Sequence, residues 1–418
     1  MRPQNLGDSL VMRNASKEDI PALLEHFKAV HGEGIIDQLR AMLEHYPRFT
    51  WEDSFIIENS NSGDVVSCVI LLENVWVLDG IQVTSVEMEA VGTLNSYRNR
   101  GHIRLLNEKF EERATEHHPI ILAVAGIPFF YRNLGYEYAA SLGGGYTVTP
   151  GLIPKLPAGE DEPVTMRPVT SENFEEFLRY RDAHLPKRTW IRKIRPEDAS
   201  YLMYELSSPM QEAFFFYLVK EKRKTIGAFF LARWENRLDI VELYLDSHQY
   251  VDAVLRFALA RAHEWNDIPV KVSPPNQKQI REYVSARTQV RNIARYAWCI
   301  KIPSVIHFIE TISPLFSDRL RDTEFQHFSG ELKATTYKEG FSLVFEKGAF
   351  IGVSEKEEKD SREYNLRIPN DALTRLLMGY ETLDEIMAHE PDVECAATMK
   401  PLVRVLFPKL EAVVDPYY

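Results

Sequence analysis

The spacing of hydrophobic positions changes several times along the first part of the chain, and each change predicts an element. Helical spacing and then strand-like runs predict two helices followed by three strands, at residues 16–30, 34–46, 53–59, 64–78 and 81–94. Asp79 and Gly80, which separate the last two runs, form a strong hairpin signal. We therefore expect a helical pair followed by an antiparallel sheet.

The pattern then alternates between helix and strand. We expect a helix at about 101–116, a strand at 120–125, a short helix at 128–135 and a strand over 136–148. Three consecutive glycines, Gly143 to Gly145, lie in the last segment with no helix after them, so we interpret them as a bend. Residues 1–150 are thus predicted to form one mixed α/β domain.

A second domain with a similar order of elements is predicted at residues 151–296. Its start is a linker, residues 149–164, that contains prolines, glycines and an acidic tip. A strand and helix, a meander of strands at 213–246 and a helix at 249–265 follow. The order of elements matches the first domain while the residues differ, which indicates a structural duplication.

Residues 297–418 show a third pattern and are predicted to form a separate α+β domain. Residues 302–316 are helical in spacing, and 325–337 and 341–354 are typical of antiparallel strands. The tail, which ends Asp-Pro-Tyr-Tyr, stays apolar and aromatic up to Tyr418. A free terminus is usually polar and disordered, so this tail is expected to be docked.

Composition narrows the class of protein. Hydrophobic residues make up 45% and charged residues 26% of the 418 residues, as in globular proteins, and no apolar run is long enough to span a membrane. The formal net charge of −12 argues against a general nucleic-acid surface. The three cysteines have no metal-ligand spacing, so we expect a cytoplasmic protein without a metal site.

One basic stretch, Ser96 to Leu106, stands out against this acidic background. A strand that ends near Thr93 leads into it, and a helix is expected to begin at about Gly101. The first amides of a helix have no partners within it and lie at the positive end of its dipole. With Arg98, Arg100 and Arg104 beside them, these amides predict a site for a pyrophosphate group.

This order of strand, Arg-x-x-Gly turn, helix and strand, followed by Phe-Tyr-Arg-Asn-Leu-Gly-Tyr, resembles the GNAT acyltransferases, whose co-substrate is acetyl-CoA. The family motif has a small residue where this chain has Ile103. Two tandem GNAT-like domains and a C-terminal domain similar to sterol carrier proteins resemble, as a set, the Eis (enhanced intracellular survival) family. The resemblance covers nearly the whole chain, and it is specific in residues 86–140 and at the C-terminus.

The resemblance implies roles for named residues. Val91, Gly92 and Thr93 would lie along the pantetheine arm, with Gly92 easing a bulge that exposes an amide to the developing oxyanion. Tyr131 matches the family tyrosine that returns a proton to the sulfur. The loop residues that would hold the pyrophosphate are Arg98, Asn99, Arg100, Gly101, His102, Ile103 and Arg104.

Two different carboxylates are candidates for the base. In Eis-like proteins the terminal carboxylate enters the catalytic site, which here implies the α-carboxylate of Tyr418. Glu87, eleven residues before Arg98, has the spacing at which other GNAT enzymes carry a base, and Glu89 shares its face of the strand. Both candidates remain open at this point.

The resemblance implies direct transfer of an acetyl group to a primary amine, in a homo-oligomer for which a hexamer is one form. The amine belongs to a small molecule or a peptide, and the sequence does not choose among aminoglycosides, polyamines, lysine side chains and peptide N-termini. The rival interpretation is a non-catalytic CoA-binding scaffold, or a carrier of an apolar ligand through the C-terminal domain.

Overall fold

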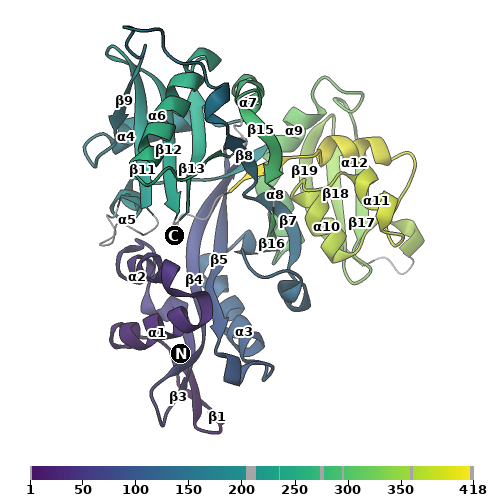
Figure 1. Cartoon of the computed structure of the whole chain (residues 1–418). Coiled ribbons are helices and arrows are strands. Elements are labelled where there is room, and N and C mark those ends of the chain that lie inside the picture. The colour runs from purple at the N-terminus through teal and green to yellow at the C-terminus, as the bar shows by residue number, and fades with distance from the viewer. Residues whose placement is uncertain are drawn as a thin grey trace.

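The computed structural model describes residues 2–203, 213–234, 236–273, 277–293, 296–357 and 361–414. The strands form three sheets, of ten, seven and five strands. The sheets and their helices make three lobes that meet at the centre of the molecule (Figure 1). The mixed α/β class predicted from the sequence is confirmed.

The first sheet has the strand order β1-β2-β3-β4-β5-β6-β16-β7, and β10 and β22 extend it beside β4. Its strands are β1 (Gln4–Gly7), β2 (Leu10–Asn14), β3 (Ser54–Asn59), β4 (Val65–Leu78), β5 (Ile81–Thr93), β6 (Ile121–Val124), β7 (Glu137–Leu142), β10 (Thr189–Arg192), β16 (Tyr296–Lys301) and β22 (Glu411–Val413). The predicted hairpin at Asp79 and Gly80 is confirmed, since Leu78 pairs with Ile81 and both turn residues have positive φ.

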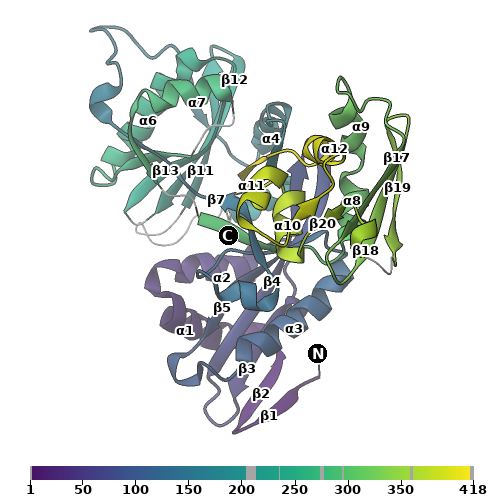
Figure 2. The same cartoon turned by 90° about the vertical axis from the view of Figure 1, so that its right-hand side faces the viewer.

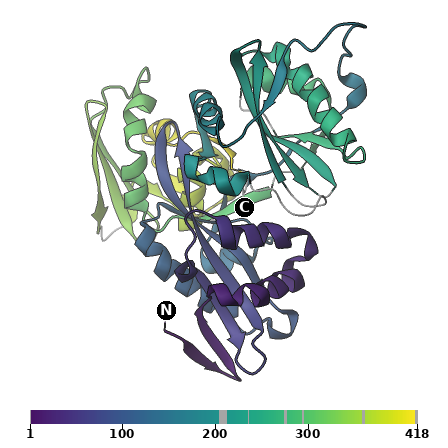
Figure 3. The same ribbon diagram turned by 90° about the vertical axis from the view of Figure 1, so that its left-hand side faces the viewer.

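Helices cover both faces of the first sheet. Helices α1 (Ile20–His31) and α2 (Ile36–His45) pack on one face and are seen as the purple helices in Figure 3. Helix α3 (His102–Ala114) packs on the other face through Leu106 and Phe110. The sheet is therefore enclosed, while its strand ends remain available for a site.

The second sheet has the strand order β15-β8-β14-β13-β12-β11-β9. Its strands are β8 (Gly145–Val148), β9 (Thr165–Pro168), β11 (Ala213–Glu221), β12 (Lys224–Trp234), β13 (Arg237–Leu245), β14 (Val270–Val272) and β15 (Thr288–Ile293). The helices in this part of the chain are α4 (Phe174–Ala183), α5 (Ala199–Leu202), α6 (Val251–His263) and α7 (Lys278–Ser285). The predicted meander and the predicted long helix are both confirmed.

Strands cross between the first two parts of the chain in both directions. The bend at Gly143 to Gly145 carries the chain out of the first sheet, so β8 pairs with β14 and β15 of the second sheet. Reciprocally, β16 returns from the second sheet to lie between β6 and β7 of the first. Hydrogen bonding thus crosses the predicted domain limits near 150 and 296, and the limits themselves stay a prediction.

The third sheet has the strand order β19-β18-β17-β20-β21. Its strands are β17 (Gly330–Thr335), β18 (Gly340–Glu346), β19 (Ala349–Lys356), β20 (Leu366–Arg367) and β21 (Glu394–Cys395). The accompanying helices are α8 (Val305–Ile312), α9 (Pro314–Leu320), α10 (Asn370–Leu377), α11 (Leu383–His389) and α12 (Lys400–Leu406), and Figure 2 shows them beside the sheet.

Three fully buried tryptophans join the parts of the molecule. The ring of Trp76 on β4 lies 5.7 Å from that of Trp298 on β16 and 6.5 Å from that of Trp190 on β10. Trp190 donates its indole N–H to the carbonyl of Met378, at the end of α10, over 3.0 Å. Trp298 donates to the carbonyl of Val414 in the tail over 2.7 Å. Each donor is satisfied, which a buried indole requires.

Candidate active site

Strands β5 and β6 pair only along the first part of β5. Their parallel register runs from Ser85 opposite Ile121 to Glu87 opposite Ala123, and β6 ends at Val124 while β5 continues to Thr93. Among the described strands, none lies along this edge of β5 beyond Glu87. The edge can therefore pair with the amide groups of an extended ligand.

A bulge interrupts β5 within this open stretch. Cys68 of β4 pairs with Gly92 and Ile70 pairs with Glu89, so Ala90 and Val91 together face one residue of β4. Ala90 has a φ of 50°, outside the strand region. The expectation that Gly92 eases the bulge is wrong, because the distortion lies at Ala90 and Gly92 has no positive φ.

Gly92 is needed for packing instead. A β-carbon at this position would lie 2.6 Å from a methyl carbon of Val30 and 3.2 Å from Nε2 of His26, both on α1. Because His26 is buried and bonded to the carbonyl of Val65 at 2.8 Å, the ring has little freedom to move away. The glycine therefore sets how closely α1 approaches the bulged strand.

The basic stretch forms an exposed corner between β5 and α3. A single 3₁₀ turn at Asn95–Tyr97 leads to Asn99, with a φ of 63°, and Gly101, with a φ of 79°, before α3 begins at His102. The first hydrogen bond of the helix runs from Leu105 to the carbonyl of Gly101 at 3.1 Å. The amides from Asn99 to Arg104 have no acceptor among the described residues, as the sequence predicts.

The three arginines of the corner are exposed, and each keeps donors that no residue in the described ranges accepts from. Arg98 donates through Nε to the carbonyl of Thr93 over 3.1 Å, which links the corner to the end of β5. Arg100 donates to the carbonyl of Ser96 over 3.1 Å. A β-carbon on Gly101 would meet nothing within 4 Å, so the backbone here is open to close approach. These features fit a diphosphate group.

Ile103 stands where the GNAT motif has a small residue, and its packing explains how the larger side chain is accommodated. Ile103 is half-buried against the cluster that contains Leu106 and Phe110, and His102 beside it is buried. Both side chains point into the protein, so neither occupies the outer side of the corner. The larger residue leaves the amides accessible.

Tyr131 lies on the same side of the sheet as the corner. It is part of a 3₁₀ helix at Phe130–Leu134 and is 5% exposed. Its ring packs in the cluster to which Val91 and Ile103 also contribute. The structure thus brings the tyrosine, the bulge and the start of α3 to one cluster.

Gly126, which sequence reasoning missed, positions the tyrosine ring. A β-carbon on Gly126 would lie 2.2 Å from Cε2 of Tyr131 and 2.9 Å from its hydroxyl oxygen. No side chain fits there unless the ring moves. The sequence signal was slight: a glycine just after a predicted strand.

Burial raises the pKa of Tyr131 well above its usual value, and the negative charge of Glu89 raises it further. The phenol therefore keeps its proton throughout the neutral range. It is suited to donate a hydrogen bond to a developing thiolate.

The structure places Glu87 in a buried ion pair on the face of β5 that points away from Tyr131. Its Oε1 accepts from the indole N–H of Trp76 at 3.0 Å, and its Oε2 lies 3.4 Å from a guanidinium nitrogen of Arg192. Burial raises the pKa of Glu87, and the charge of Arg192 opposes that rise. The carboxylate is 0% exposed, so an acceptor reaches it only if this network opens.

Tyr418 lies outside the described residues, but the approach of the tail is defined. Strand β22 pairs in parallel with β10, with Thr189 opposite Glu411. The carbonyl of Val414 is then held by Trp298. The chain is therefore docked against the first sheet as far as Val414, and the position of Tyr418 stays a prediction.

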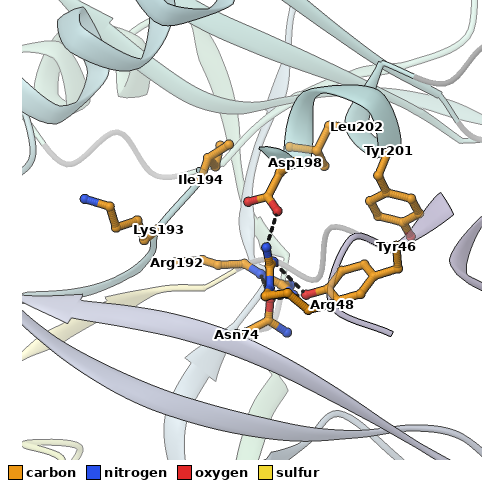
Figure 4. Close-up of a pocket in the computed structure, with 9 residues that line it drawn as sticks. All are labelled: Tyr46, Arg48, Asn74, Arg192, Lys193, Ile194, Asp198, Tyr201 and Leu202. Atoms are coloured by element: carbon orange, nitrogen blue, oxygen red, sulfur yellow. Dashed lines mark hydrogen bonds and ion pairs between the residues drawn. The ribbon is translucent and has the colours of Figure 1, made fainter. Parts of the chain in front are cut away.

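A small pocket lies where α2, β4, β10 and α5 meet (Figure 4). Inside it, the hydroxyl of Tyr46 lies 2.6 Å from Oδ1 of Asn74, and Arg48 pairs with Asp198 at 2.6 Å. The residues that line it are Tyr46, Arg48, Asn74, Arg192, Lys193, Ile194, Asp198, Tyr201 and Leu202. It therefore joins residues from both sides of the predicted limit at 150.

In the second sheet, β13 has an edge that corresponds to the open edge of β5, but here a side chain occupies it. Strand β13 pairs with β14 only as far as Ile240, and from there to Leu245 it is paired with β12 but has no described strand on its other side. There the carboxamide of Gln277 accepts from the amide of Leu245 and donates to its carbonyl, both at 3.0 Å. A side chain thus takes the main-chain positions that remain open along β5.

Comparison with known proteins agrees with this geometry. Residues 11–139 match the model of the acetyltransferase (GNAT) domain family. No curated protein matches the sequence. The chain is an acyltransferase, with a GNAT domain that holds the corner, the bulge and Tyr131.

Solved structures with the same fold span nearly the whole chain. A GCN5-related N-acetyltransferase from Anabaena variabilis has a TM-score of 0.68 at 16% identity, with 97% of this chain and 99% of that chain covered. Eis1 from Mycobacterium abscessus has a TM-score of 0.62 at 12% identity, with 97% and 100% covered. N-myristoyltransferase from Saccharomyces cerevisiae, bound to myristoyl-CoA, has a TM-score of 0.52 at 13% identity, with 72% and 80% covered. These likenesses establish the fold.

None of the helices in the described ranges is both long and apolar enough to span a bilayer. Within the same ranges, no group of three or more histidine, cysteine or acidic residues is placed to hold a metal ion.

Proposed function

We propose that this acyltransferase moves an acetyl group from acetyl-CoA to a primary amine in a single step. The observation that carries the proposal is the exposed corner at Asn99–Arg104, whose unpartnered amides continue directly from the open, bulged end of β5. A diphosphate at the corner would orient the pantetheine arm along Val91 to Thr93. The thioester would then lie near the bulge.

Each chemical requirement of acyl transfer has a candidate group in this proposal. An amide exposed by the bulge, that of Val91, would stabilise the oxyanion. Tyr131 would donate to the departing thiolate. The amides from Asn99 to Arg104, with Arg98 beside them, would hold the co-substrate.

Direct transfer is favoured over a covalent intermediate by the state of the cysteines. Cys68 and Cys299 are buried, at 0% and 1% exposure, and burial raises the pKa of both thiols. A protonated, enclosed thiol is a poor nucleophile. Cys395 is half-buried in β21 of the third sheet.

For the base, we place the α-carboxylate of Tyr418 first and Glu87 second. The docking of β22 and Val414 holds the chain against the first sheet four residues before Tyr418, which supports a role for the terminal carboxylate. The ion pair of Glu87 with Arg192 makes direct contact with an acceptor harder. We also propose a homo-oligomer, and a second domain that shapes the acceptor site without chemistry of its own.

The third sheet supports a second candidate function, carriage of an apolar ligand by a sterol-carrier-like domain. Tyr337, Val344 and Ile351 are large hydrophobic residues of this region that are 51%, 36% and 59% exposed. Exposed apolar residues of this kind can mark a binding surface. A pure carrier would release no thiol from acetyl-CoA and would retain lipid through purification.

Release of free CoA thiol from acetyl-CoA, measured with a panel of amines, tests the proposed function. We expect thiol release with at least one amine, and a loss of roughly 100-fold in Tyr131→Phe, which keeps the ring but removes the donor. Deletion of Tyr418 should cause a comparable loss, because the terminal carboxylate would move. Tyr337→Phe, at an exposed tyrosine of the third domain, is the matched control and should keep full activity.

A wild-type protein that releases no thiol with any amine would contradict the enzyme proposal. Full activity in Tyr131→Phe would remove Tyr131 from the mechanism and leave the acyl transfer itself standing.

A further inference from the structure

The segment that links β6 to the 3₁₀ helix of Tyr131 makes an unusual turn at Phe129. Phe129 has a φ of 70° and a ψ of −29°, a conformation that a bulky residue rarely adopts. The amide of Phe130 donates to the carbonyl of Pro128 over 2.9 Å, which closes a tight three-residue turn around Phe129. Turns of this kind are strained, so they persist only where neighbouring groups hold them.

Burial of the Phe129 side chain does not hold this turn. The side chain is 64% exposed, and that of Ile127 in the same segment is 65% exposed. The contacts that hold the turn are therefore those of its main chain.

One of these contacts comes from Tyr138 on β7. The amide of Phe129 donates to the hydroxyl of Tyr138 over 2.5 Å. The half-buried Tyr138 side chain packs against the apolar cluster that contains Tyr131, and its ring lies 6.0 Å from the ring of Tyr296 on β16. Tyr138 thus joins the exposed turn to two strands of the first sheet.

The turn at Phe129 also determines how the helix of Tyr131 begins. The carbonyl of Phe129 accepts from the amide of Arg132 over 3.3 Å, at the start of that 3₁₀ helix. The amide and the carbonyl of one residue are fixed relative to each other by its φ and ψ. A bond that holds the Phe129 amide therefore also holds the start of the helix that carries Tyr131.

The same segment contacts the ring of Tyr131 directly. Gly126, before the turn, lies so close to the phenol that an added β-carbon would be 2.9 Å from the hydroxyl oxygen. The ring of Phe130, after the turn, lies 5.2 Å from the Tyr131 ring, edge to face. A change in the turn between these two contacts would therefore move the hydroxyl.

We infer that Tyr138 is a positioning residue for Tyr131. The Tyr138 hydroxyl holds the amide of Phe129, the turn at Phe129 fixes the segment on both sides of it, and this segment places the Tyr131 hydroxyl. The inference rests on the proposed function only for the chemical role of Tyr131 as proton donor. The placement of its hydroxyl rests on the contacts described above.

Steady-state kinetics of thiol release from acetyl-CoA test this role. Tyr138→Phe keeps the ring and removes the acceptor for the Phe129 amide. We expect kcat to fall about tenfold or more and the KM for acetyl-CoA to stay within about twofold of the wild type, because the change moves the phenol and not the diphosphate corner. Tyr337→Phe, which also removes a tyrosine hydroxyl bonded to the main chain, is the matched control and should keep wild-type kinetics.

A second substitution separates the turn from a general loss of stability. Glycine adopts a positive φ without strain, so Phe129→Gly should keep the turn even when Tyr138 offers no acceptor. We expect the double variant, Tyr138→Phe with Phe129→Gly, to recover kcat to within about threefold of Phe129→Gly alone. A kcat that stays low in the double variant would overturn the inference, and so would a wild-type kcat in Tyr138→Phe.

A measurement without turnover separates this inference from the proposed function. With a fluorotyrosine incorporated at position 131, fluorine NMR of the full chain reports the surroundings of that phenol. We expect a different chemical shift in Tyr138→Phe and a return toward the wild-type shift in the double variant. An unchanged shift in Tyr138→Phe would overturn the inference, whereas the expected shifts in a protein that releases no thiol would contradict only the proposed function.

If Tyr138→Phe does not fold, amide hydrogen exchange in the wild type still tests the hydrogen bond. The amide of Phe129 should exchange at least about tenfold more slowly than the same amide in an unstructured peptide, because it is bonded to Tyr138. Exchange at the unstructured rate would overturn the inference.

Discussion

At the residue scale, the position of the Tyr131 ring depends on Gly126, which has no β-carbon to displace it. Gly126 lies two residues after β6, and a β-carbon added to it would lie 2.2 Å from Cε2 of the phenol ring. The hydroxyl of Tyr131 is near the same point. A small change at Gly126 should therefore move Tyr131, the proposed proton donor, and leave the corner that would hold the diphosphate in place.

We expect Gly126→Ala to lower kcat by about tenfold or more, because a displacement of about 1 Å from the productive geometry is costly. The affinity for CoA, measured by calorimetry, should change little. Gly151→Ala is the control, since its new β-carbon would meet nothing within 4 Å and its φ is ordinary. Wild-type kcat in Gly126→Ala would show that the ring tolerates the shift.

At the element scale, the end of α3 is joined to β3 and β4 by a charge cluster. His117 follows α3, and its Nδ1 lies 2.9 Å from Oε2 of Glu73 on β4. Its Nε2 lies 3.5 Å from Asp53, just before β3, and Arg113 of α3 pairs with the same carboxylate at 2.8 Å. Hydrogen bonds to Asp53 and Glu73 raise the pKa of His117 to about 9.

This raised pKa makes a prediction about stability with a definite sign. A histidine whose pKa is higher in the folded state stabilises the fold fully below its unfolded pKa of 6.5, and the gain is lost as pH rises through about 9. Because His117 is partly solvated, screening limits the gain to about 1 kcal/mol. The free energy of unfolding of His117→Gln should therefore be lower than that of the wild type at pH 6 and should approach it above pH 9.

Urea unfolding of both proteins across this pH range measures the difference. His307→Gln, at an exposed histidine of α8, provides the control. A difference that does not depend on pH would contradict the assignment of the stabilisation to the charged form of His117.

At the scale of the whole molecule, the exchanged strands make the first two sheets depend on each other. Strand β16 holds β7 to the first sheet, and Lys301 at its end pairs with Glu111 of α3 at 2.7 Å. Strand β8 lies between β14 and β15 of the second sheet. Neither sheet is complete without a strand from the other part of the chain.

We expect the wild-type chain to unfold in one transition, because loss of either sheet removes a strand from the other. Far-UV circular dichroism reports the strands and helices, and tryptophan fluorescence reports the buried cluster of Trp76, Trp190 and Trp298. The two urea curves should coincide. Two transitions that separate cleanly would show that the sheets are stable apart.

Local sequence predicted much of the fold and the outline of the site. The hairpin at Asp79 and Gly80 and the exposed turn around Gly101 follow from residues that are adjacent in the chain. The strand exchange could not be predicted, because the sequence of a short strand such as β8 does not indicate which sheet the strand joins. The need for glycine at position 92 could not be predicted either, because it comes from the side chain of Val30, which is distant in sequence.

The sequence by itself determined the elements and the exposed basic corner, because turn residues, helix starts and arginine spacing act over a few neighbouring residues. Only the tertiary structure decided which carboxylate faces which partner. Glu87 and Glu89 share a face of β5, yet it is Glu87 whose carboxylate the structure brings beside Trp76 of β4 and Arg192 of β10. That choice depends on strands and helices brought together from distant parts of the chain, and side-chain charges respond to whatever lies near them in space.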